Sequence, residues 1–318
     1  MVSAGLLLIV GGLAFLYFKK PAQRPPSAEV IERTPARLQR GNYLVEGPFG
    51  CLGCHSQFDE NVYSMPPKPG TEGGGGFCFN ERNVGFPGQV CAQNITPDPE
   101  AGIGNWTDGE VMRAIREGVA KDGHALFPMM PYAEFHALSD EDTRSIVAYL
   151  RTLRPLRGAP PPAFLKFPVS LLVKFEPKPL EGPVPQPDPH DSIATGQYYA
   201  RACEGCHTPV DKTMHPIAGR AFSGGREFHF PGLTIVSPNI TFDETGLGGK
   251  SREQFVAMFK SFAEQPLPRT QIGSNTLMPW YALSKMSEPD LGAVYDYLQT
   301  VPRIRNQVQR RPTTALPQ

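Results

Sequence analysis

The chain has 318 residues, with 31 basic and 31 acidic side chains and a formal net charge of zero. This length is enough for two ordinary domains. The balanced charge gives no global field that would favour nucleic acid or an anionic membrane surface, so binding to a partner must depend on local patches.

The first predicted element is an apolar run over residues 2–18. As a helix it would be about 26 Å long, which is just enough to span a bilayer. Such a run is also typical of the apolar core of a signal peptide. Because no small-x-small cleavage site precedes Lys19, we expect residues 1–20 to be an uncleaved transmembrane anchor or signal-anchor, followed by a Pro-containing tether over residues 21–35.

Two copies of the pentapeptide Cys-x-x-Cys-His lie at residues 51–55 and 203–207. Each is the attachment signature of a c-type haem. The two thiols of a copy lie on one side of a helical turn, where they can add to the vinyl groups of one haem, and the His reaches the iron as an axial ligand. We therefore predict two covalently bound haem c groups. The residues that hold them are Cys51, Cys54, His55, Cys203, Cys206 and His207.

The same series of elements follows both pentapeptides in the same order. The series comprises an Asn-Ile-Thr segment (94–96 and 239–241), a capping-box helix start (107–110 and 251–254), a Met-Pro-aromatic tripeptide (130–132 and 278–280) and a second capped helix start (139–142 and 287–290). Capping boxes pair a side chain and a backbone group at each end of the first helical turn. A repeat of this length indicates two duplicated domains and not a solenoid.

Two further cysteines, Cys78 and Cys91, lie in a Gly-rich stretch that only the first half carries. In an exported protein we expect such a pair to form a disulfide, which stabilises the fold by about 3 kcal/mol in the loop-entropy description. Two free or partly buried thiols are the alternative.

The segment from Pro155 to Pro189 contains 11 prolines and is predicted to be extended and semi-rigid. Its middle, residues 164–175, is apolar. We expect a short packed segment there that covers a haem edge or joins the two domains; surface packing without any role toward haem is the alternative.

The repeat indicates Met130 and Met278 as the second axial ligands of the two irons, opposite His55 and His207. A thioether ligand favours Fe(II) and raises the reduction potential, and the Pro after each Met stiffens its loop. Met129 is an alternative to its neighbour Met130.

Four polar residues of the repeated Asn-Ile-Thr segments are candidates for haem contacts: Asn94, Thr96, Asn239 and Thr241. A buried carboxylate needs donors, so we expect these side chains to bond the haem propionates or the backbone around them. Simple turn chemistry is the alternative. A single four-cysteine zinc site is a competing interpretation of the pentapeptides, but the wide separation of the two Cys pairs and the His in each argue against it.

With these motifs the chain resembles the class I cytochrome c family twice, over roughly residues 36–155 and 190–302. Further shared features are the Gly-x-Tyr of the first helix (41–43 and 196–198) and the closing helices around 148–150 and 296–298. The resemblance implies that the first and last helices of each domain cross near the Gly and that Met is the distal ligand. More narrowly, the run from Asn94 to Trp106 is similar to one in the cytochrome subunits of membrane-bound periplasmic dehydrogenases of the alcohol, aldehyde or gluconate type.

The expected fold is therefore all-α, with two tandem class I cytochrome c domains and an N-terminal membrane-anchor helix. The expected order is the anchor (1–20), the tether (21–35), domain 1 (36–157), a Pro-rich linker (158–189), domain 2 (190–306) and a tail (307–318).

The predicted function is that of a membrane-tethered dihaem electron carrier. It would take electrons from a dehydrogenase or quinol-oxidising complex and pass them to an oxidase or a soluble cytochrome. Lys19, Lys20 and Arg24 would be cytoplasmic by the positive-inside rule, but covalent haem attachment occurs outside, so we expect the periplasmic side of the bacterial inner membrane, with residues 2–18 as the anchor.

Two other functions remain open: a dihaem peroxidase or sulfur-compound oxidase, and a structural redox subunit of a larger membrane complex. The sequence shows no constellation of general acid, general base and nucleophile, so we do not expect catalysis by side chains.

Overall fold

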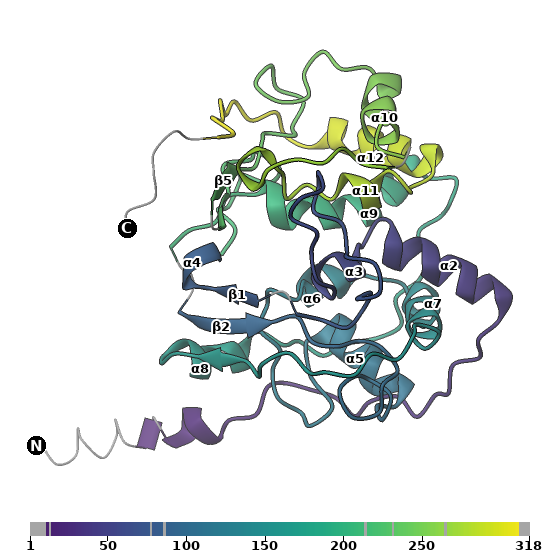
Figure 1. Cartoon of the computed structure of the whole chain (residues 1–318), viewed down its shortest axis with the longest axis vertical. Coiled ribbons are helices and arrows are strands. Elements are labelled where there is room, and N and C mark those ends of the chain that lie inside the picture. The colour runs from purple at the N-terminus through teal and green to yellow at the C-terminus, as the bar shows by residue number, and fades with distance from the viewer. Residues whose placement is uncertain are drawn as a thin grey trace, which may run out of the picture.

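The computed structural model describes residues 11–12, 14–76, 78–84, 87–212, 215–230, 232–263 and 266–311. Two halves lie against each other, the first coloured purple to teal and the second green to yellow (Figure 1). The helices of the first half are α2 (Pro35–Glu46), α3 (Cys51–Cys54), α5 (Asp108–Glu117), α6 (Tyr132–Phe135) and α7 (Asp140–Leu150). Those of the second half are α9 (Ser192–His207), α10 (Arg252–Lys260), α11 (Trp280–Leu283) and α12 (Glu288–Thr300).

Helix caps set the predicted helix starts in both halves. The Thr107 side chain accepts from the backbone of Glu110, whose carboxylate accepts from the backbone of Thr107, and Ser251 and Gln254 repeat this exchange. Two of the otherwise unsatisfied backbone N–H groups at each start are thereby bonded. The capping boxes predicted at these positions are confirmed.

The first and last helices of each half cross at a glycine. A Cβ atom on Gly41 of α2 would lie 2.0 Å from the carbonyl oxygen of Ser145 in α7, and one on Gly196 of α9 would lie 1.9 Å from that of Ala293 in α12. No side chain fits at such distances, so only glycine lets the backbones approach this closely. Buried apolar residues from both halves then form one continuous core.

The all-α fold class is wrong, because the chain also forms two small antiparallel sheets. Strands β1 (Cys78–Asn80), β2 (Gly88–Cys91) and β3 (Phe164–Leu165) form one sheet, and β4 (Glu227–Phe230) and β5 (Leu233–Val236) form the other. Short elements connect to these sheets: α4 (Glu81–Val84), α8 (Val169–Leu172) and the 3-10 helices η1 (Val173–Phe175) and η2 (Ile272–Ser274). Strands of two to four residues are too short to show an alternating pattern, which is why the sequence did not reveal them.

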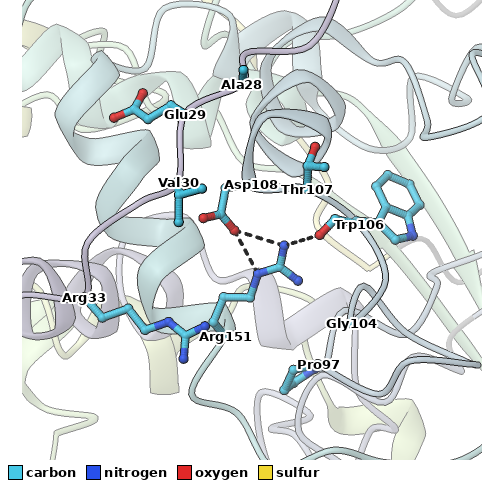
Figure 2. Close-up of a pocket in the computed structure, with 10 residues that line it drawn as sticks. All are labelled: Ala28, Glu29, Val30, Arg33, Pro97, Gly104, Trp106, Thr107, Asp108 and Arg151. Atoms are coloured by element: carbon cyan, nitrogen blue, oxygen red, sulfur yellow. Dashed lines mark hydrogen bonds and ion pairs between the residues drawn. The ribbon is translucent and has the colours of Figure 1, made fainter.

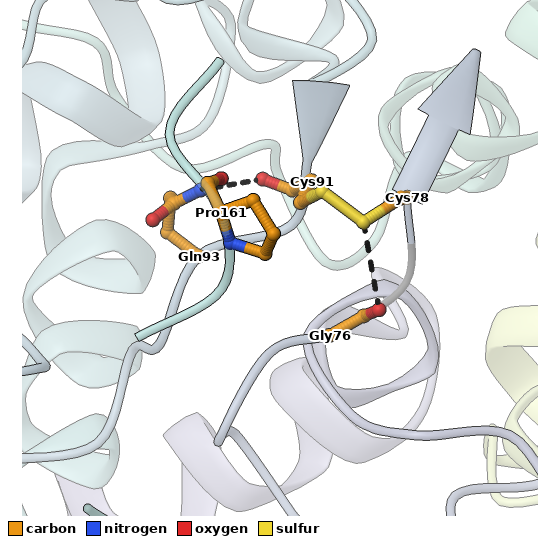
Figure 3. Close-up of a disulfide and its surroundings, with 5 residues drawn as sticks. All are labelled: Gly76, Cys78, Cys91, Gln93 and Pro161. Carbon is orange, nitrogen blue, oxygen red and sulfur yellow. Dashed lines mark hydrogen bonds between the residues drawn. A yellow bond between two sulfur atoms is a disulfide. The ribbon is translucent and has the colours of Figure 1, made fainter. Parts of the chain in front are cut away.

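The disulfide predicted between Cys78 and Cys91 is confirmed, with an S–S distance of 2.00 Å. The two residues are opposite each other in the register of β1 and β2. Figure 3 shows the disulfide beside Gln93, whose side chain donates to the carbonyl oxygen of Cys91 (2.8 Å). The disulfide therefore fastens the edge of the three-stranded sheet.

The predicted membrane-anchor helix over residues 2–18 is not supported. Within the part of the chain that the structure describes, no helix is both long and apolar enough to cross a bilayer. Residues 1–10 and 13 of the predicted anchor lie outside that part. Residues 14–18 are helical, and residues 19–34 form neither helix nor strand.

The segment predicted to be a tether follows the surface of the first half. The Ile31 backbone N–H donates to the Asp108 carboxylate (2.9 Å), and Arg24 pairs with the buried Glu117 (2.9 Å). A Cβ atom on Gly109 would lie 2.0 Å from the carbonyl oxygen of Ser27. The buried charge on Glu117 needs a partner, and the tether provides it. This segment is therefore bound to the first half, and we refer to residues 21–35 as the strap.

A cavity of about 420 Å³ lies between the strap and the first half (Figure 2). Arg151 forms one side, where its guanidinium donates to the Asp108 carboxylate (3.0 Å) and to the carbonyl oxygen of Trp106 (2.6 Å). Glu29 and Arg33 of the strap line the other side. The hydrogen bond from Ile31 to Asp108 connects the strap to the start of α5 beside this cavity.

Candidate haem sites

The two pentapeptides occupy different helical contexts. The first forms the one-turn helix α3, because Gly47 ends α2 and Gly50 adopts a φ of 51° just before Cys51. The second forms the last turn of α9, which runs without interruption from Ser192 to His207. The Gly-Pro-Phe-Gly sequence at residues 47–50 has no counterpart before Cys203, which explains the difference.

Both histidines are held in the tautomer that a metal ligand requires. Nδ1 of His55 lies 2.6 Å from the carbonyl oxygen of Gln93, and Nδ1 of His207 lies 2.8 Å from that of Pro238. A carbonyl oxygen only accepts, so the hydrogen-bond network assigns the proton to Nδ1 and leaves the lone pair on Nε2. Burial lowers the pKa of both imidazoles and keeps them neutral, as iron ligation requires.

The four thiols of the pentapeptides are free and protonated. Burial raises the pKa of Cys51 and Cys203 to about 12 and that of Cys54 to about 11. The Cys54 and Cys206 side chains are nevertheless exposed. An exposed thiol is accessible for addition to a haem.

The two pentapeptides lie near each other at the boundary between the halves. Burial raises the pKa of Cys54, and Cys206 lies close enough to raise it further. Each motif also borders a short helix of the opposite half. A Cβ atom on Gly53 would lie 2.7 Å from the Tyr281 hydroxyl of α11, and one on Gly205 would lie 3.7 Å from Oε1 of Glu134 in α6.

The two methionine loops have the same backbone conformation. The Tyr132 backbone N–H donates to the carbonyl oxygen of Met130 (2.7 Å), and that of Trp280 donates to Met278 (2.8 Å). The prolines between them have φ near −80° and ψ of 51° and 62°, so each loop is an inverse γ-turn. Met130 and Met278 both pack against the buried core, of which Met129 is not a member. Their role as iron ligands remains a prediction.

The repeated Asn and Thr side chains are buried and bonded to the protein itself. Oδ1 of Asn94 accepts from the backbone and hydroxyl of Thr96 (2.9 and 2.7 Å), while its amide donates to the carbonyl oxygen of Leu156 (2.7 Å). Asn239 bonds Thr241 and the carbonyl oxygen of Ile304 in the same way. Both pairs therefore fasten the chain after the last helix to the Asn-Ile-Thr turn, and the propionate contact remains a prediction.

These features fit haem in both halves. Each half combines an accessible Cys pair, a neutral His with a free Nε2, and a Met on a matched turn. In the described residues, no three His, Cys, Asp or Glu side chains converge as a metal site.

Sequence reasoning missed a loop that joins the two halves beside Met278. The fully buried Asn275 donates to the carbonyl oxygens of Glu60 and Val62 (3.0 and 2.9 Å) and accepts from the backbone of Ser64 (2.9 Å). The Ser64 hydroxyl in turn donates to the carbonyl oxygen of Met278 (2.7 Å). The first half thereby helps to position the methionine of the second, and no local pattern in the sequence could have indicated this.

The chain is similar to cytochromes across most of its length, although no family model matches it. It is 28% identical, over 87% of its residues, to the cytochrome c subunit of the quinone alcohol dehydrogenase of Gluconobacter oxydans, of which it covers 57%. The gluconate 2-dehydrogenase cytochrome c subunit of Pantoea cypripedii is 25% identical over 95% of the chain and is 65% covered. A diheme cytochrome c-type protein of Cereibacter sphaeroides is 28% identical over 76% of the chain and 79% covered.

The chain thus spans less than two thirds of the length of the dehydrogenase subunits that it matches. The predicted resemblance to cytochrome c subunits of such dehydrogenases is confirmed.

Proposed function

We propose that this chain, a relative of the cytochrome c subunits of quinone-linked dehydrogenases, holds two covalent haem c groups and transfers electrons between a dehydrogenase and a downstream acceptor. The observation that carries the proposal is the matched pair of histidines, each with Nδ1 bonded to a backbone carbonyl beside two accessible thiols. A disulfide-rich domain would not need this arrangement.

The first haem would be held by the thiols of Cys51 and Cys54, with His55 and Met130 on the iron. The second would be held by Cys203 and Cys206, with His207 and Met278. When bound, haem supplies a reversible Fe(II)/Fe(III) couple. The carbonyl oxygens of Gln93 and Pro238 keep the Nδ1 protons in place, and each inverse γ-turn fixes the direction of a Met side chain.

A dehydrogenase as electron donor is supported by the relatives, which are subunits of alcohol, gluconate and fructose dehydrogenases. Their role as cytochrome subunits favours electron transfer over catalysis by this chain. The acceptor would be an oxidase or a soluble cytochrome. The place of action would be the periplasmic face of the membrane, where covalent haem attachment occurs.

Mass spectrometry of the denatured protein, produced in a host that attaches haem c, tests the proposal. We expect a mass increase of two haems for the unchanged chain and of one haem for Cys51→Ala/Cys54→Ala or Cys203→Ala/Cys206→Ala. The matched control is Cys78→Ser/Cys91→Ser, which should keep both haems. An unchanged chain with fewer than two haems would contradict the proposal.

Rapid mixing tests the electron transfer itself. The reduced catalytic subunit of a quinone-linked alcohol dehydrogenase should reduce both haems of the chain, and an oxidised soluble cytochrome c should reoxidise them. A chain that carries two haems but exchanges no electrons with either protein would keep the cofactor assignment and overturn the function.

A further inference from the structure

An exposed apolar surface extends along one edge of the first half. Four large side chains of the linker, Phe164, Phe167, Leu172 and Phe175, are between 48% and 70% exposed. Phe15, Tyr17 and Phe18 near the N-terminus are 65% to 78% exposed. These seven are most of the ten large apolar side chains that are exposed in the described residues. Such concentration is typical of an interaction site and not of the scattered apolar residues on an ordinary surface.

Contacts between the two segments make these seven residues one surface. The Lys174 ammonium donates to the carbonyl oxygens of Leu16 and Tyr17 (3.2 and 2.6 Å). The Lys19 ammonium lies 4.9 Å from the centre of the Phe175 ring. Figure 1 shows α8 and the N-terminal segment at the same edge of the molecule. We refer to the seven residues together as the apolar edge.

The disulfide-bonded sheet holds the apolar edge in its exposed position. Strand β3, which contains Phe164, pairs with β2 through Gly88 and Gln89. Strand β2 is fastened to β1 by the Cys78–Cys91 disulfide (Figure 3). Lys166 adds an ion pair to Glu81 beside β1 (2.9 Å). A free linker would fold its apolar side chains back onto the protein, whereas this sheet fixes the start of the segment in place.

Lysines border the apolar edge. Residues 14–20 and 164–178 contain Lys19, Lys20, Lys166, Lys174 and Lys178 but Glu176 alone among acidic residues. The whole chain is neutral, so this excess is local. Protein–protein interfaces are depleted in lysine. Aromatic and aliphatic side chains flanked by lysine are instead typical of surfaces that lie on anionic lipid.

We infer that the apolar edge rests on the surface of an anionic lipid bilayer. Its aromatic rings would enter the headgroup region and the lysines would face lipid phosphates, without any segment of the edge crossing the membrane. This contact goes beyond the proposed electron transfer and does not depend on it.

A spin label on the apolar edge tests the inference in the full haem-loaded chain. Haem attachment and the disulfide consume all six cysteines in the proposed holoprotein, so Phe167→Cys would introduce a single free thiol. Ile217→Cys, at a residue that is 43% exposed in the second half, is the matched control. Titration of the unchanged holoprotein with a thiol reagent is done first, and free thiols there would count against haem attachment and not against lipid contact.

With vesicles that contain phosphatidylserine, we expect the label at position 167 to become several-fold more accessible to oxygen and several-fold less accessible to a water-soluble nickel chelate. The label at 217 should not change, and a label at Leu172→Cys should repeat the result of position 167. Lys20→Gln/Lys178→Gln should weaken the effect several-fold. Equal accessibility at 167 and 217 would overturn the inference. Protection from both reagents that appears only with solubilised membrane proteins would overturn it in favour of a protein partner.

Discussion

The Tyr43 hydroxyl, on the first helix of one half, donates a hydrogen bond to Asp290 at the start of the last helix of the other half. It also accepts from the backbone N–H of Ser287 (3.1 Å). Tyr198 repeats the arrangement in the opposite direction, with bonds to Asp142 (2.8 Å) and to the backbone of Ser139 (3.2 Å). Each half therefore completes the helix cap of the other, and these bonds hold the two halves, with their candidate haem sites, in one fixed arrangement.

Removing either hydroxyl should loosen the boundary between the halves. A hydrogen bond to a charged group contributes about 1.5–3 kcal/mol, so Tyr43→Phe and Tyr198→Phe should each lower the free energy of unfolding by that amount. Both should also broaden or split the calorimetric transition, because the halves then unfold less cooperatively.

The matched control for this pair is Tyr295→Phe. The Tyr295 hydroxyl donates to the carbonyl oxygen of Lys250 (2.8 Å) within the second half. Loss of this hydrogen bond should lower the free energy of unfolding but leave the two halves unfolding together. A single sharp transition in the double variant Tyr43→Phe/Tyr198→Phe would contradict the interpretation.

The glycines at the helix crossings should tolerate no side chain. Gly41→Ala and Gly196→Ala place a methyl group within 2.0 Å of a backbone oxygen, so the helices must separate. We expect each to lose at least about 2 kcal/mol of stability in urea unfolding. Gly182→Ala, where no atom lies within 4 Å of the added Cβ, should be nearly neutral. Equal stability of Gly41→Ala and Gly182→Ala would show that the crossing can relax.

An ion pair between the halves should make their contact sensitive to acid. Glu46 of α2 accepts from Lys285 of the second half (2.7 Å). Burial alone would raise the pKa of Glu46, but hydrogen bonds from Lys285 and Tyr149 outweigh it and lower the pKa below 4.5. A carboxyl with a lowered folded-state pKa stabilises fully above its unfolded pKa and loses that contribution as the pH falls through the folded value.

Glu46→Gln should therefore be less stable than the unchanged chain at pH 7 and approach it below about pH 4. Urea unfolding at several pH values measures the difference. Glu181→Gln, at an exposed position in the linker, serves as the control for a carboxylate outside the boundary. A constant difference between Glu46→Gln and the unchanged chain across this range would exclude the ion pair as its source.

The disulfide should stabilise the sheet of β1, β2 and β3 without affecting the candidate haem sites. Cys78 and Cys91 are 13 residues apart, and closing such a loop contributes about 3 kcal/mol in the loop-entropy description. Mild reduction should raise the hydrogen exchange of β1, β2 and β3 and leave that of α2 and α7 unchanged. Exchange that rises equally in all five elements would mean that the sheet is part of one cooperative unit with the helices.

Local chemistry could be predicted from the sequence where the partners lie close together in the chain. The capping boxes at Thr107 and Ser251 each close over three residues, and Cys78 and Cys91 are confined to one short segment. Tyr43 and Asp290 are 247 residues apart. Both halves contain the same Tyr and Asp, so nothing in the sequence says whether each Tyr caps its own half or the other.

The small sheets and the strap were missed for related reasons. Strands of two to four residues carry no periodicity. The three-stranded sheet forms because the Gly-rich stretch and the linker meet in space, whereas β4 and β5 pair with each other. The Pro-containing strap resembles a free spacer in sequence. It is bound because α5 buries Glu117 and Arg113, whose partners Arg24 and Gln23 lie in the strap.

The methionine ligands can be tested one iron at a time. The matched turns predict that Met130→Ala and Met278→Ala each remove one of two near-infrared sulfur-to-iron absorption bands and lower the reduction potential of that haem, because a thioether favours Fe(II). Met129→Ala should keep both bands. If Met129→Ala removes a band and Met130→Ala does not, the ligand of the first iron is Met129. If the unchanged protein already has one high-spin haem, an open iron site and a peroxidase-type reaction become the better explanation for that half.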